Sequence, residues 1–510
     1  MQMRGMCKQF GSVAANADVN LTVHAGTVHG LVGENGAGKS TLMSVLYGFY
    51  QADAGSIEVS GEPVVIRNAD DAIALGIGMV HQHFMLVESL SALDNVMLGA
   101  EPHWSLKRSQ DQVRRALQSL MQRTGLKVPL DTRVDALAVG DRQRLEILKA
   151  LYRGAKILIL DEPTAVLTPQ ETRQLFSVLA TLRSQGTTLI LITHKLKEVM
   201  DLCDRVTVMR AGRVVLDLPI AQASTDLLAE AMVGRRVNLE RSPDVELGLV
   251  PGGPVLLSVK NVCLRDALQV PRLSDVSLTL RSGEIVGVAG VSGNGQSELL
   301  EVLSGLSQPQ QGSLTVGDAR VDPHEFTHER WLDPRTARAL GVAHVPEDRH
   351  ARGLVMDFVA WESAFLGYEG GPDASWRGWM KHRAMRRLTK HWMARFDVRP
   401  PEPGLGSSKF SGGNQQKLIL ARELGQAPAI LLVGQPTRGV DIGAIEFIYG
   451  QLRAMRDAGC AVLLVSSELD EILALSDRVV VMVQGRISGE LPAGECNETE
   501  LGRLMAGAVA

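Results

Sequence analysis

Short apolar runs bounded by turn-forming residues recur along the chain, and stretches with helical spacing of apolar positions separate them. Runs rich in branched residues, the pattern of parallel strands covered on both faces, lie at 156–161, 188–193, 430–433 and 461–465. Strands that alternate with helices in this way predict an α/β fold. Between 89 and 136, and between 355 and 407, the pattern is mostly helical, which predicts a helical subdomain in each half of the chain.

The pattern of the first half recurs in the second. Residues 204–209 match 477–482 at an offset of 273 residues, and 160–164 match 433–437 at the same offset. Two glycine-rich turns nearer the start of each half match at an offset of 257. We therefore expect a tandem repeat, with insertions in the second copy between its glycine-rich turn and its later motifs.

The length of the chain agrees with two globular domains, because 510 residues exceed one ordinary core. The repeat places the domains at 1–236 and 255–510, and residues 237–254 have the Pro, Gly and charged content of a linker. No apolar stretch approaches the roughly 18 to 20 residues that span a bilayer, so we do not expect the chain to form a membrane channel by itself.

The net charge of −4 gives no electrostatic reason to expect nucleic-acid binding. The basic stretch 376–395 carries Met385, Leu388 and Trp392 near one helical face, which favours an amphipathic helix over a nucleic-acid contact. The five cysteines are scattered and lack metal-type spacing, so we expect free thiols in a reducing cytosol.

A glycine-rich turn in the first domain has the spacing of a phosphate-binding loop, and it stands between an apolar run and a helix-like stretch. In such a loop backbone N–H groups close on phosphate oxygens, Lys39 faces the β and γ phosphates, and Ser40 can ligate Mg²⁺. The residues predicted to bind ATP here are Gly33, Glu34, Asn35, Gly36, Ala37, Gly38, Lys39, Ser40 and Thr41.

Two carboxylates, Asp161 and Glu162, follow the apolar run 157–160. This is the strand end where α/β sheets place their ligands. We expect Asp161 to hold the metal and Glu162 to act as general base toward the attacking water.

Together these motifs resemble the ABC-type ATPases over nearly the whole chain. The resemblance implies that Gln82 lies near the metal and the attacking water, that His194 senses the γ-phosphate, and that Phe10 stacks on adenine. A purely structural role for His194 and a core position for Phe10 are the alternatives.

The second copy departs from this set at five positions. It carries Gln296 for the loop lysine, Gly434 and Gln435 for the two carboxylates, Glu347 for Gln82 and Ser467 for the histidine. A glutamine brings no positive charge and cannot take a proton from water. Because the loop glycines and Ser297 remain, nucleotide binding stays possible there, whereas fast hydrolysis is not expected.

The resemblance also implies that each nucleotide-binding site consists of the phosphate-binding loop of one copy and a signature segment of the opposite copy. In the second copy, Ser411, Gly412 and Gly413 offer a hydroxyl and backbone N–H groups at a helix start, which suits a γ-phosphate. The first copy has Ala138 and Asp141 in the matching segment. We therefore expect one competent site, joining the first copy's catalytic residues to Ser411, and one impaired site.

Fused tandem ATPases with one degenerate half are similar to the ATP-binding subunits of bacterial importers for simple sugars and nucleosides. The segments 79–87 and 161–171 look more like nucleoside-type members, with ribose or another simple sugar as the alternative. The resemblance implies two transmembrane permease subunits, an extracytoplasmic solute-binding protein and a peripheral location at the cytoplasmic face of the cell membrane. Residues 83–86 form either one wall of a groove for the permease or part of the core. A soluble tandem ATPase acting on ribosomes remains the other class, although the short, mixed-charge linker disfavours it.

Overall fold

The computed structural model describes the chain except for residues 12, 82–83, 101–105, 165–166, 168, 236–252, 291–292, 318–322 and 506–510. The contacts divide it into two compact units, Met1–Val237 and Asn238–Ala510. Residues 236–252, which include most of the predicted linker, lie outside the described part.

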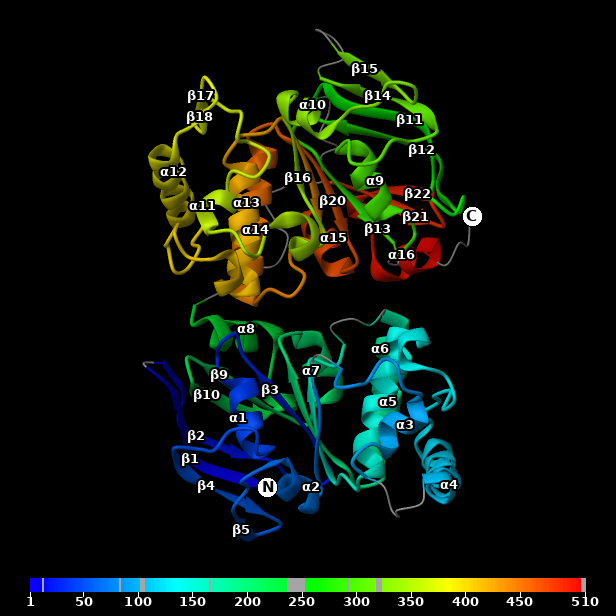
Figure 1. The fold of residues 1–510 in the computed structure, drawn as a ribbon, viewed down its shortest axis with the longest axis vertical. Helices are drawn as coiled ribbons and strands as arrows, with labels where there is room; N and C mark the ends of the chain where they lie inside the picture. The colour runs from blue at the N-terminus through cyan, green and yellow to red at the C-terminus, as the bar shows by residue number, and fades with distance from the viewer. Residues whose placement is uncertain are drawn as a thin grey trace. The chain divides into compact units, whose positions relative to one another are not determined.

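Unit 1 is an α/β domain with two sheets (Figure 1). The central sheet has the order β10-β9-β3-β8-β7-β6, in which all neighbours are parallel except β10 and β9. The second sheet has the order β2-β1-β4-β5 and is antiparallel. The strands are β1 Gln2–Phe10, β2 Val13–Thr22, β3 Val28–Val32, β4 Ala54–Val59, β5 Glu62–Val64, β6 Ile77–Val80, β7 Ile157–Asp161, β8 Thr188–Thr193, β9 Arg205–Arg210 and β10 Arg213–Pro219.

The helices of unit 1 cover the central sheet and form the predicted helical region. Helices α3, α4 and α5 contact one another, and α4 also contacts α6. The helices are α1 Lys39–Leu46, α2 Ala69–Ala74, α3 Ala92–Met97, α4 Leu106–Thr124, α5 Val139–Tyr152, α6 Pro169–Ser184, α7 Leu196–Leu202 and α8 Thr225–Val233, with 3-10 turns η1 Val134–Ala136 and η2 Ile220–Gln222.

Unit 2 repeats this topology. Its central sheet has the order β16-β19-β20-β13-β21-β22 and its antiparallel sheet the order β12-β11-β14-β15. The strands are β11 Val255–Arg265, β12 Pro271–Arg281, β13 Ile285–Ala289, β14 Gln311–Val316, β15 His324–Thr327, β16 Val342–Val345, β17 Ser375–Trp376, β18 Trp379–Met380, β19 Ile430–Gly434, β20 Ala461–Ser466, β21 Arg478–Val483 and β22 Arg486–Pro492.

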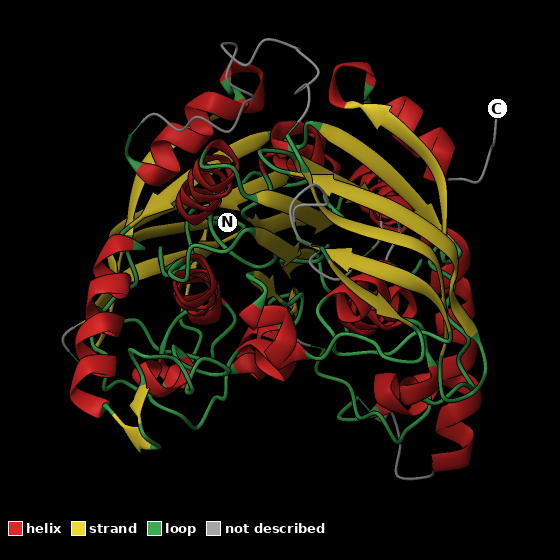
Figure 2. Ribbon diagram, turned by 90° about the horizontal axis from the view of Figure 1, so that it is seen from above, coloured by secondary structure: helices red, strands yellow, loops and turns green. Residues whose placement is uncertain are grey.

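The helical region of unit 2 includes a short hairpin, β17-β18, before its long helix. The helices are α9 Gln296–Leu303, α10 Pro334–Ala339, α11 Ala360–Ser363, α12 His382–Arg395, α13 Gly412–Leu424, α14 Ile442–Asp457, α15 Leu469–Leu475 and α16 Glu498–Met505, with a π-helical turn η3 Arg349–Gly353 and 3-10 turns η4 Ser407–Lys409 and η5 Ala493–Glu495. Helices pack against the central sheet of each unit, among them α7 on β3 and β8 and α15 on β13 and β20. Figure 2 shows the helices in red and the strands in yellow.

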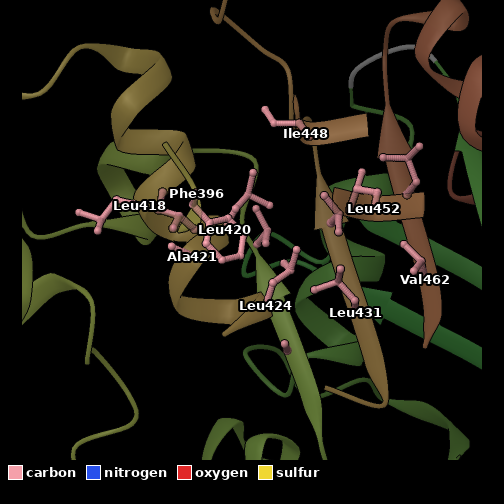
Figure 3. Close-up of a cluster of buried hydrophobic side chains, with 14 of the residues drawn as sticks. Phe396, Leu418, Leu420, Ala421, Leu424, Leu431, Ile448, Leu452 and Val462 are labelled. Atoms are coloured by element: carbon pink, nitrogen blue, oxygen red, sulfur yellow. The ribbon is translucent and has the colours of Figure 1, made fainter. Parts of the chain in front are cut away.

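The predicted amphipathic helix is confirmed as α12. Met385 and Trp392 are buried in the core, and Leu388 packs against it, because the apolar face turns toward α11 and α13. Figure 3 shows the neighbouring part of this core, where Leu420 and Leu424 of α13 lie near Leu431 of β19. The predicted central strands are also confirmed, and their side chains are buried along their whole length.

Candidate functional site

In unit 1 the predicted site residues come from three neighbouring parallel strands, β3, β8 and β7. Lys39 opens α1 after β3, Asp161 ends β7, and His194 directly follows β8. Since parallel strands end at the same edge of a sheet, these residues meet at the carboxyl edge of the central sheet.

The glycine-rich loop closes around the Lys39 ammonium. Lys39 Nζ donates to the carbonyl oxygens of Gly33 at 2.7 Å and Glu34 at 3.0 Å. Gly38 has φ 96° and approaches the backbone of Ala15 so closely that any Cβ would collide with it. Gly36, with φ 84°, faces open space. The loop therefore fits a phosphate group, with a positive charge held beneath an exposed backbone turn.

Ser40 and Asp161 are joined by a hydrogen bond in which the hydroxyl donates to the carboxylate. Burial raises the pKa of Asp161, while the Ser40 hydrogen bond and the nearby charge of Lys39 act in the opposite direction. A hydroxyl and a carboxylate side by side are oxygen ligands of the kind Mg²⁺ takes together with phosphates and water. No cluster of three His, Cys, Asp or Glu side chains suited to a metal occurs in the described part of the chain.

Glu162 and His194 form a pair, with Nδ1 of the histidine 2.7 Å from Oε1 of the glutamate. Burial alone would raise the pKa of Glu162, but the hydrogen bond from His194 and the charges of His194 and Lys39 outweigh it and hold the pKa below its usual value. Glu162 is therefore a carboxylate at neutral pH, as a group that accepts a proton must be.

Two further residues support this edge of the sheet, and sequence reasoning missed both. Asn16 in β2 is buried and donates from Nδ2 to the carbonyl oxygen of Gly38 at 3.0 Å. Glu198 in α7 is buried and accepts hydrogen bonds from Thr164 and Thr193, which ties the turn after β7 to the end of β8. The one signal for Asn16 was a polar residue at a buried position of β2.

The remaining candidates of unit 1 are exposed or lie outside the described residues. Phe10 is 41% exposed and its ring meets Tyr50 edge-on at 5.1 Å, so it is not a core residue. Gln82 and His83 lie outside the described part. Met85 is 60% exposed, so the apolar segment that contains it is not simply core.

The signature segments of the two units share a backbone conformation and differ in chemistry. Ser411 caps α13 with φ −62° and ψ 157°, and its Oγ accepts from Asn414 Nδ2 at 2.9 Å. Gly412 and Gly413 follow in the first turn of α13. At the matching place Ala138 precedes α5 with φ −60° and ψ 153° and has no side-chain cap.

Comparison with known proteins finds one family match in each of the two units. The sequence profile described as "ABC transporter" matches residues 17–165 and 273–438, once in each unit. The chain belongs to the ABC transporter ATP-binding family. It is therefore an ATP-binding protein with two ABC ATPase domains, and the predicted family and fold class are confirmed.

Three relatives that match almost the full length are named as import proteins. The chain is 43% identical to the guanosine import ATP-binding protein NupO of Bacillus subtilis (strain 168), over 99% of this chain and 97% of that one. It is 41% identical to the nucleoside import ATP-binding protein NupA of Lactococcus lactis subsp. cremoris (strain MG1363), over 99% and 98%. The ribose import ATP-binding protein RbsA 2 of Burkholderia cenocepacia (strain HI2424) is 38% identical, over 97% and 95%.

Among solved structures, the archaeal ribosome recycling factor aABCE1, in complex with stalk protein aP1, matches 99% of this chain and 92% of its own with a TM-score of 0.65. At 17% identity this similarity concerns the fold alone. None of the described helices of this ABC protein is long and apolar enough to cross a membrane.

The second ABC unit repeats the backbone of the first site with other side chains. Gln435 has the same φ of 47° as Glu162, and its Oε1 accepts from Ser467 Oγ at 3.1 Å. Gln296 opens α9 and is as buried as Lys39 in unit 1. Neither a loop ammonium nor a carboxylate–imidazole pair is present at these positions.

Proposed function

We propose that this chain is the ATP-hydrolysing subunit of a bacterial importer for nucleosides. The observation that carries the proposal is the similarity, over 99% of the chain, to proteins named for guanosine and nucleoside import. The cluster of Lys39, Ser40, Asp161, Glu162 and His194 in unit 1 supports the ATPase activity.

In this proposal the unit 1 residues divide the work of hydrolysis. Lys39 and the loop glycines hold the β and γ phosphates, while Ser40 and Asp161 hold Mg²⁺, which neutralises phosphate charge when bound. Glu162 accepts the proton of the attacking water, and His194 orients Glu162 through the 2.7 Å contact. Gln82 is assigned to the metal and water by the family resemblance, and Phe10 to the adenine ring.

We further propose, from the family resemblance, that Ser411, Gly412 and Gly413 bind the γ-phosphate of ATP. The capping geometry of Ser411 leaves its exposed hydroxyl at a helix start, a favourable environment for the γ-phosphate. Ala138 cannot offer a hydroxyl in the equivalent site.

The proposed partners are two transmembrane permease subunits and an extracytoplasmic solute-binding protein, with the chain peripheral at the cytoplasmic face of the membrane and no nucleic-acid partner. The relatives named as import proteins and the exposed apolar side chain of Met85 support this arrangement. Co-purification separates the classes: permeases support the importer, and ribosomes would support the soluble class instead.

Transport of purine nucleosides, pyrimidine nucleosides and pentoses into cells lacking the chain tests the substrate. We expect nucleoside uptake to be lost and to return with the wild-type chain but not with Lys39→Ala. Loss of pentose uptake alone would favour a ribose importer, the class represented by the relative at 38% identity.

A further inference from the structure

The end of β19 in unit 2 lacks the metal-binding aspartate of unit 1, yet a carboxylate occupies its place. Gly434 ends β19 where Asp161 ends β7. A Cβ built on Gly434 would collide with Cγ of Glu347, which enters from the loop after β16. The glycine therefore makes room for a carboxylate that arrives from the neighbouring strand β16 rather than from β19 itself.

The Glu347 carboxylate accepts a hydrogen bond from a serine hydroxyl, as Asp161 does in unit 1. Ser297, in the first turn of α9, donates from Oγ to Glu347 Oε2 at 2.6 Å. In unit 1 the corresponding Ser40 donates to Asp161. Glutamate has one methylene more than aspartate, and it bonds to the serine from the loop after β16 rather than from the end of β19.

We propose that unit 2 binds nucleotide together with a divalent cation, and that Ser297 and Glu347 are the protein ligands of that cation. The inference rests on the proposed ATP-binding function. A carboxylate and a hydroxyl beside a phosphate-binding loop are the oxygen donors that Mg²⁺ accepts alongside phosphate oxygens and water. Gly293 and Gly295 keep positive φ angles of 90° and 103°, so the described part of the loop retains the turn of unit 1.

The same site holds its nucleotide without rapid hydrolysis. Gln435 occupies the position of Glu162 and cannot accept a proton from water. The Glu347 carboxylate accepts a hydrogen bond from Ser297, the other proposed metal ligand. Glu347 therefore serves as a metal ligand and does not replace Glu162 as the general base. Two of the five departures from the first copy, Gly434 and Glu347, thus compensate each other, while Gln435 removes turnover.

Binding of Mn²⁺ in place of Mg²⁺, measured by electron paramagnetic resonance with a non-hydrolysable ATP analogue, tests the proposal on the full chain. The wild type is expected to bind two Mn²⁺ ions per chain. Glu347→Gln keeps the shape of the side chain, and we expect it to weaken one of the two ions by at least about tenfold. Asp161→Asn is the matched variant and should weaken the other ion only.

Moving the carboxylate from position 347 to position 434 tests whether Glu347 is a metal ligand or only a structural residue. The double variant Glu347→Ala/Gly434→Asp removes the Cγ that a Cβ at position 434 would meet and places an aspartate at the strand end, as in unit 1, so it should restore the second Mn²⁺. Two tightly bound ions in Glu347→Gln would overturn the inference. If Asp161→Asn still weakens one ion in that case, the proposed ATP site of unit 1 stands independently.

Discussion

Replacement of Glu162 by glutamine tests the proton-accepting role most directly. The backbone N–H of Glu162 donates to the carbonyl oxygen of Ile192 at 2.8 Å, and the side chain meets His194 at 2.7 Å. A carboxamide keeps this shape but cannot accept a proton from water. ATP binding should persist, because the phosphate contacts of Lys39 and the loop are untouched.

The expected loss follows from the role of a general base, which contributes typically 10²- to 10⁴-fold to a rate. At about 1.4 kcal/mol per tenfold, the barrier rises by about 3 to 6 kcal/mol. The pKa of Glu162 lies below its usual value, so the wild-type base is already ionised at neutral pH. Raising the pH should not rescue the variant, because the glutamine side chain does not titrate.

The assay is steady-state phosphate release at saturating ATP and Mg²⁺, with equilibrium binding of a fluorescent ATP analogue measured in parallel. Gln435→Ala is the matched control, since Gln435 has the same backbone conformation in unit 2. We expect this control to turn over ATP at the wild-type rate. Retention of more than about a tenth of the rate in Glu162→Gln, or an equal loss in the control, would refute the reasoning.

Three other predictions concern capping, pH and a buried ion pair. Ser411→Ala should lower ATP turnover and reduce the free energy of unfolding by about 1 kcal/mol, because the helix cap is lost. Ala138→Ser should raise the free energy of unfolding by a similar amount in urea denaturation without changing turnover. Equal effects of the two variants on turnover would contradict the assignment. Burial lowers the pKa of His29 from 6.5 to about 4, so the unfolded chain takes up the proton first. The free energy of unfolding should therefore be highest above pH 6.5 and fall by about 3 kcal/mol as the pH is lowered to 4. Denaturation curves of His29→Gln across this range should lack this loss. Glu423→Gln leaves the buried Arg422 without its charged partner at 2.7 Å and should cost about 3 to 5 kcal/mol in thermal unfolding, and an unchanged Tm would contradict it.

Periodicity predicted the central strands closely. The predicted run at 188–193 is β8 at Thr188–Thr193, and the run at 156–161 is β7 at Ile157–Asp161. These strands are buried along their length, so their apolar composition is a direct consequence of their position. The hairpin β17-β18 was not predicted, because two residues per strand are too few to carry an alternating pattern.

The sequence by itself determined which chemical groups each unit possesses: a lysine, two carboxylates and a histidine in the first, and glutamines, a glycine and a serine in the second. The tertiary structure decided which groups meet. The order of parallel strands brings His194 to Glu162 across 32 residues and Glu347 to Ser297 across 50. Gly434 and Glu347 looked like two separate losses in the sequence, and only the packing of β16 beside β19 shows that one makes room for the other.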